Sequence, residues 1–128
     1  MLVDEARAWS QWLRTFDWDW FATGTWSRPV GTQAAIDTVA RWLQPLPRAY
    51  AAIGVQRGPT AEKYHVHAVI GGTGRHRDTA LQLGGSWIHS GHVQLLGFTP
   101  KRGGIEYLVR QATEIELLGQ PVLYRARR

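Results

Sequence analysis

Two histidines separated by one residue are the first candidates for chemistry in this sequence. His65 and His67 flank Val66 in a run of strand-forming residues, 64–70. Alternate side chains of a strand share a face, so the two imidazoles project together, about 7 Å apart at the backbone. The intervening residues are largely apolar and are expected to face the core. Two neutral imidazoles at this spacing can converge on one divalent metal ion.

A metal ion on this pair needs at least one further ligand. Gln56 ends the strand that is expected to pair with the histidine strand, so it can lie beside His65. Glu62 is a harder ligand, but strand alternation aims it at the other face. Gln111 is a third candidate. Two imidazoles and one oxygen leave positions open for a phosphate and water, which favours Mn²⁺ or Mg²⁺ over a structural zinc ion.

A tyrosine on the last expected helix is a candidate nucleophile. Residues 105–118 carry an apolar stripe at helical spacing, and Tyr107, Gln111 and Glu114 line its flank. A tyrosine beside a buried stripe usually only packs there. Its hydroxyl can attack phosphorus, however, when a nearby metal takes up charge from the phosphate. The histidine pair would supply that metal.

The elements that must position these residues follow from hydrophobic periodicity and turn signals. Thr32 is the expected N-cap of the second helix. The sequence predicts an α+β fold with a central antiparallel sheet of four to five strands, helices packed on it and a split β-α-β connection. Its length indicates one domain, residues 1–128. The expected helices are 2–15, 32–44, 78–83 and 105–118, and the expected strands are 17–26, 50–56, 62–70, 91–98 and 122–124.

The overall composition favours a nucleic-acid partner. The net charge is +5, and seven tryptophans include rings that could stack on bases. The absence of cysteine excludes disulfides and fits a reducing cytoplasm. We expect neither a membrane-spanning segment nor a signal peptide, because no apolar run is long enough and acidic residues precede the first tryptophan.

Basic loop residues are the expected phosphate contacts. They are Arg75, Arg77, Lys101 and Arg102. Trp26 ends the first strand, where its ring either stacks on a base or is buried.

Three segments in this order resemble the motifs of the HUH endonucleases, and among them the small rolling-circle replication initiator (Rep) proteins. Residues 21–26 resemble the aromatic- and Thr-rich motif that lies near bound DNA, which makes Thr23 and Thr25 expected DNA contacts. Residues 65–67 resemble the metal-binding motif. Residues 107–110 resemble the Tyr-x-x-Lys motif on a helix. The resemblance spans about residues 16–116 and implies a ferredoxin- or RRM-like HUH fold.

Two positions depart from the family pattern. Arg110 stands where the family usually has lysine, and since arginine is a poor proton donor its implied role is to orient the phosphate. Gln56 stands where Rep proteins usually have an acidic metal ligand. Gln111 stands four residues after Tyr107, where related transposases carry a ligating Gln or Asn. The order of preference for the third ligand is Gln56, Gln111, Glu62.

The resemblance implies a metal-dependent, site-specific endonuclease that nicks and joins single-stranded DNA. The ion on His65 and His67 polarises the phosphate, and Tyr107 attacks it to leave a 3′-OH and a 5′-phosphotyrosine. The expected partner is a replication origin or hairpin of a plasmid or virus, in the cytoplasm of a bacterium, archaeon or infected host. A homodimer would let two copies of Tyr107 cut and rejoin in turn.

Two alternative functions are open from the sequence. One is a single-tyrosine transposase of the same superfamily. The other is a non-catalytic protein that binds single-stranded nucleic acid, because the same layout resembles RNA-recognition folds. In that case stacking aromatics on the sheet, rather than the histidines, would be the functional residues.

Overall fold

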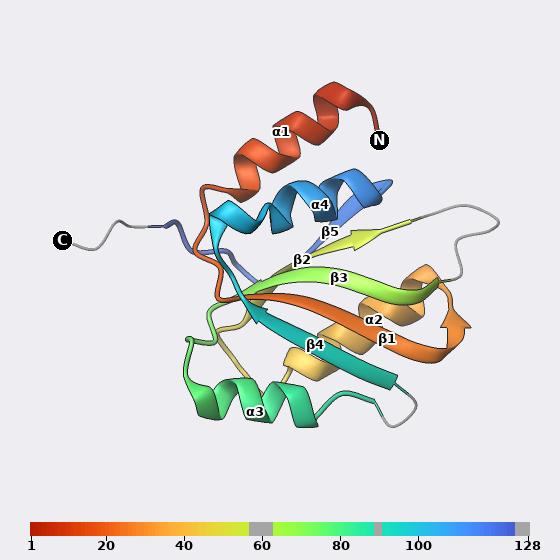
Figure 1. The fold of residues 1–128 in the computed structure, drawn as a ribbon, viewed down its shortest axis with the longest axis vertical. Coiled ribbons are helices and arrows are strands. Elements are labelled where there is room, and N and C mark those ends of the chain that lie inside the picture. The colour runs from red at the N-terminus through yellow and green to blue at the C-terminus, as the bar shows by residue number, and fades with distance from the viewer. Residues whose placement is uncertain (57–62, 89–90, 125–128) are drawn as a thin grey trace.

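A five-stranded antiparallel sheet with helices on both faces forms this protein in a computed structural model, which describes residues 1–56, 63–88 and 91–124 (Figure 1). The order across the sheet is β4-β1-β3-β2-β5. The elements are α1 (Val3–Leu13), β1 (Trp20–Val30), α2 (Thr32–Leu43), β2 (Tyr50–Val55), β3 (Lys63–Gly71), α3 (Arg77–Gly85), β4 (Gly91–Gly97), the 3₁₀ turn η1 (Pro100–Arg102), α4 (Gly104–Gln111) and β5 (Glu114–Leu118).

The connection β1-α2-β2 leaves room for one strand, and β3 occupies it. β3 pairs antiparallel with β1 on one side and with β2 on the other. This is the split β-α-β arrangement expected from the sequence. The prediction of an α+β fold with an antiparallel sheet and helices packed on it is therefore confirmed.

The two faces of the sheet are covered by different pairs of helices. α2 and α3 lie against one face, and α1 and α4 lie against the other (Figure 1). Because side chains alternate along each strand, each pair of helices buries its own apolar cluster. The α2–α3 side includes Ala22, Ile36, Val39, Trp42, Ile53 and Ile70, and the α1–α4 side includes Leu13, Trp18, Ala52, Val69, Ile105 and Leu108.

A glycine brings α4 close to the sheet. Gly54 on β2 is paired with His67 on β3. A Cβ atom at Gly54 would lie 3.1 Å from the backbone oxygen of Leu108 and 3.2 Å from its Cγ atom. The missing side chain therefore lets α4 pack directly over β2, next to the histidine strand.

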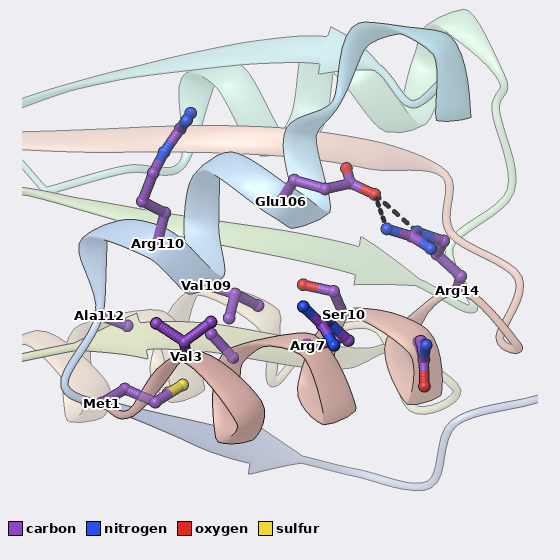
Figure 2. Close-up of a pocket in the computed structure, with 11 residues that line it drawn as sticks. Met1, Val3, Arg7, Ser10, Arg14, Glu106, Val109, Arg110 and Ala112 are labelled. Carbon is purple, nitrogen blue, oxygen red and sulfur yellow. Dashed lines mark hydrogen bonds and ion pairs between the residues drawn. The ribbon is translucent and has the colours of Figure 1, made fainter.

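An ion pair joins the C-terminal end of α1 to α4. The Nη2 atom of Arg14 lies 2.5 Å from Oε1 of Glu106, and its Nε atom donates to the same oxygen at 2.6 Å (Figure 2). Both side chains are about half exposed, so the pair contributes little to overall stability. It nevertheless holds Glu106 toward α1.

The predicted helix 105–118 is wrong beyond Gln111. Ala112 has an extended backbone, and Glu114–Leu118 form strand β5 on the edge of β2. The apolar residues of this segment fit both the spacing of a helix and the alternation of a strand. A strand here also gains backbone hydrogen bonds to the edge of β2, which a longer helix would not make. Glu114 pairs with Val55 and is therefore not on the Tyr107 flank.

Three other predicted boundaries need correction. Residues 122–124 do not form a strand; only an isolated bridge joins Phe16 and Leu123. β1 continues through residues 27–29, which were expected to end it, because an irregular register after Thr25 accommodates the proline. Thr32 is the first helical residue rather than the N-cap, and its hydroxyl donates to the backbone oxygen of Gln56.

None of the helices in the described part of the chain is long and apolar enough to cross a membrane.

We expect the close approach at Gly54 to limit which residues this position accepts. Valine favours strands, but its methyl groups would press on Leu108 and displace α4, so Gly54→Val should destabilise the fold by about 1–3 kcal/mol. Chemical denaturation measures this change. The control is Gly84→Ala in α3, where a Cβ atom meets nothing within 4 Å. That variant should be neutral or more stable by up to about 1 kcal/mol, and an unaffected Gly54→Val would contradict the packing argument.

Candidate active site

Strand register brings the expected site residues of β1 and β3 to one face. Thr23 pairs with His67, and Thr25 pairs with His65. On its other side β1 pairs with β4, where His92 lies opposite Thr25. All of these positions share the face on which α1 and α4 pack.

The two histidines lie side by side on this face. Their ring centroids are 5.1 Å apart, with His65 exposed and His67 half-buried. The hydroxyl of Thr23 is 3.1 Å from Nδ1 of His67, so these two groups share a hydrogen bond. Such a bond orients the imidazole and leaves Nε2 as the ring nitrogen available to a further ligand.

The environment of His67 favours its neutral form. Burial, reinforced by the charge of neighbouring His65, lowers the pKa of His67 to about 4. Both effects penalise the imidazolium ion. At neutral pH His67 therefore has a lone pair that can bind a cation or accept a proton.

Tyr107 reaches the histidines from α4. Its ring centroid lies 5.1 Å from that of His67, and its side chain is 40% exposed. The guanidinium carbon of Arg110, one helical turn later, lies 5.9 Å from the centre of the Tyr107 ring. Tyr107 thus lies next to its helix neighbour Arg110 and next to His67, which comes much earlier in the chain, on β3.

Phe21 completes this cluster and was not identified as a site residue from the sequence. Its ring stacks on His67 at 5.7 Å and contacts Tyr107 edge-on at 6.5 Å. α4 can begin beside it because Gly104 has no side chain: a Cβ atom there would lie 2.8 Å from the Phe21 ring. The available signal was strand alternation, which places Phe21 on the same face as Thr23.

Gln56 is well placed among the candidates for the third ligand. The β2–β3 pairing ends at Gly54 and His67; continued for two more residues along each chain, it would set Gln56 opposite His65. Its side-chain nitrogen donates to the backbone oxygen of Gln111 at 2.7 Å, which leaves the amide oxygen to accept or ligate. Gln111 itself contributes that carbonyl, and its side chain is exposed.

Glu62, the remaining candidate ligand, lies outside the described residues. Within the described part of the chain, no three His, Cys, Asp or Glu side chains are placed to hold one metal ion. Of the expected ligands, the structure places His65 and His67 side by side and Gln56 just beyond the end of the neighbouring strand.

Of the two alternatives for Trp26, stacking on a base or burial, the structure has burial, so Trp26 is not an exposed DNA contact. Trp26 is 7% exposed and lies on the α2–α3 side, where its ring centroid is 5.5 Å from that of Trp87. Thr25 is on the site face, and its hydroxyl donates to the backbone oxygen of His92 at 3.0 Å. Thr23 shares a hydrogen bond with His67, a role that the sequence did not indicate.

The four basic residues expected to contact phosphate fall into two groups. Lys101 and Arg102 are exposed in η1, immediately before the helix that carries Tyr107. Arg75 instead donates to the backbone oxygen of Trp18 at 2.8 Å, and Arg77 begins α3, which covers the opposite face. Only the first pair belongs to the surroundings of Tyr107.

No protein-family model, no curated protein and no solved structure matches this chain at a significant level. The similarity to HUH endonucleases therefore rests on the three short motifs and remains a prediction.

The lowered pKa can be measured directly. In the metal-free protein, we expect the His67 imidazole resonances to titrate with a midpoint at about 4. Since the unfolded chain binds this proton near pH 6.5, folding stability contributed by His67 is present above that pH and is lost as the pH falls through 4. In His65→Gln the midpoint should rise. A midpoint near 6.5 in the wild-type protein would contradict the half-buried position of the ring.

Proposed function

We propose that this protein is a metal-dependent endonuclease that cuts single-stranded DNA through a covalent 5′-phosphotyrosine. The observation that supports this function is the placement of the Tyr107 ring 5.1 Å from His67, with Arg110 beside it. A tyrosine that only packs would need neither a neutral imidazole nor a cation beside it. The 40% exposure of Tyr107 also leaves it accessible to a polymer substrate.

The reaction transfers a phosphoryl group from one hydroxyl to another. The phenolic oxygen of Tyr107 forms a bond to phosphorus, and the bond between phosphorus and the 3′ oxygen breaks. The proton lost by the phenol is balanced by the proton that the leaving 3′ oxygen gains. Because the phosphotyrosine preserves the energy of the phosphodiester, a 3′-OH can later reverse the step and rejoin DNA.

His65, His67 and Gln56 are the residues that would hold the metal ion. A divalent ion bound there would draw negative charge from the phosphate oxygens. The Thr23 hydroxyl orients His67 for this task, and the hydrogen bond from Gln56 to Gln111 orients the amide. Arg110 would hold the phosphate near Tyr107 through its fixed guanidinium donors.

A single strand is the form of DNA that suits this surface. The site lies on a broad sheet face with exposed polar side chains, including His65, His92 and Gln94. Unpaired bases can lie flat on such a face while a basic residue at its edge, Lys101, neutralises a phosphate. A role in initiating rolling-circle replication of a plasmid or virus, and cutting by two subunits of a dimer, rest on the motif resemblance alone.

The nucleophile can be tested by trapping the intermediate. Incubated with Mn²⁺ and single-stranded oligonucleotides, the protein should form an adduct that survives a denaturing gel. Tyr107→Phe should form no adduct, because no phenolic oxygen remains. His67→Ala should reduce the yield at least a hundredfold, on the order of several kcal/mol of lost charge stabilisation.

The matched control is Tyr124→Phe, since Tyr124 is also exposed, at 62%, but lies beyond β5 and outside the cluster. This variant should react like the wild type. An adduct that persists in Tyr107→Phe would contradict the assigned nucleophile. If no oligonucleotide forms an adduct but strands still bind, the protein is a non-catalytic binding protein instead.

The third ligand can be tested by adding charge. If the Gln56 amide oxygen binds the metal, Gln56→Glu should tighten Mn²⁺ binding roughly tenfold, because affinity rises with ligand charge. Isothermal titration calorimetry measures this change. Gln111→Glu is the control, because the Gln111 side chain is exposed and only its carbonyl meets Gln56. Tighter binding in the control alone would transfer the role to Gln111.

A further inference from the structure

A groove beside Tyr107 is not used by the proposed reaction. It lies between β4 and the start of α4 and has a volume of about 390 Å³. Phe21, Leu96 and Phe98 form its apolar surface. Arg102 and Tyr107 also line it, so the groove is continuous with the candidate active site.

Strand order and helix placement create this groove. Phe21 on β1 pairs with Leu96 on β4, so both side chains point to the site face. α4 packs over β2 and β3, and none of the described helices covers β4 on this side (Figure 1). Leu96 is consequently 40% exposed beside a phenylalanine that already stacks on His67.

The lining suits a flat heteroaromatic group with a polar edge. A volume of this size is within the range of small-molecule sites, which combine an apolar floor with a few polar groups. Phe21 and Phe98 supply ring surface, and Arg102 and Arg110 supply guanidinium donors. Glu106 also lines the groove, but its carboxylate is engaged by Arg14 (Figure 2).

A second groove, between α1 and α4, is larger, but its described lining has no aromatic ring on which a base could stack. It has a volume of about 430 Å³, and its lining mixes apolar residues such as Met1 and Val3 with charged ones such as Arg7 and Arg14. Arg110 lines both grooves, with its side chain extending away from α1 (Figure 2), but Tyr107 lines only the smaller one. The smaller groove is therefore the one that is continuous with the proposed nucleophile, Tyr107.

We infer that the groove between β4 and α4 holds one nucleobase of the bound strand, from one of the two nucleotides that flank the attacked phosphate. This inference rests on the proposed function, because Tyr107 both lines the groove and attacks the phosphate. The base lies against Phe21 and Leu96, and Arg102 donates hydrogen bonds to its edge. Arg102 is thus a specificity-determining residue, whereas Lys101 next to it contacts only the backbone.

The test uses a fluorescein-labelled single strand selected for binding from a random-sequence pool. Abasic nucleotides are placed at each position in turn, and affinity is measured by fluorescence anisotropy. One abasic position should weaken binding roughly tenfold or more, the effect of losing one base–aromatic stack. Adduct mapping with Mn²⁺ should place that position next to the cleaved phosphate.

Leu96→Asp should remove this sensitivity, because a carboxylate in the groove repels the base and the strand. Its matched control is Leu81→Asp, since Leu81 is 63% exposed on α3, across the sheet from the groove. Circular dichroism verifies that both variants fold.

A second pair of variants does not depend on the folding of Leu96→Asp. Arg102→Ala should abolish base preference at the sensitive position, while Lys101→Ala should weaken the binding of all strands equally.

The possible failures are distinguishable. Binding with one sensitive position but no adduct overturns the proposed endonuclease; the groove then still holds a base, but the placement of that base beside an attacked phosphate is overturned too. An adduct without a sensitive flanking position, or with equal sensitivity in wild type and Leu96→Asp, overturns the base site alone. A pool from which no strand can be selected overturns both.

Discussion

The antiparallel pairing of β1 with β3 determines both the core and the site. It runs in one register from the Trp20–Ile70 pair to the Thr25–His65 pair. A slip of one residue would turn every side chain of β3 to the other face and bury the histidines. The burial of Ala22 and Ala68 on the α2–α3 side prevents that slip, because both are only 2% exposed. The same apolar contacts that stabilise the sheet therefore place Thr23 beside His67.

The rotation of α4 about its axis follows from a second apolar set. Ile105, Leu108 and Val109 are each at most 2% exposed, so this stripe must face the sheet. Tyr107 is two positions after Ile105, on the flank of the stripe, and this flank faces β3 and β1 rather than α1. Gly54 then sets the depth of the helix. Apolar packing of α4 therefore determines how far Tyr107 lies from β3 and in which direction its side chain points. No polar contact is needed to orient it.

The strand carrying the histidines was predictable because its faces differ clearly in polarity. The end of α4 was not, because Ile115 fits the helical spacing from Leu108 and also alternates with Leu117 in a strand. Only the free edge of β2, a tertiary feature, decides between the two periods. The sequence left the burial of Trp26 open for a related reason. Its alternation with Thr25 was visible, but both faces of this sheet bury apolar residues, so alternation alone could not say which face α2 covers.

The site lies where the helix-covered part of the sheet meets its uncovered part, and this boundary explains its chemistry. α4 shields His67 enough to keep it neutral, while His65, one pair of positions away, stays exposed. A fully buried site could not admit a charged polymer, since desolvating its phosphates would cost too much free energy. A fully exposed one would leave the imidazole protonated for more of the pH range and hydrate the tyrosine. For the function we propose, a site beside β3 is therefore the best placed, because β1 and β4 are left open to hold the bases.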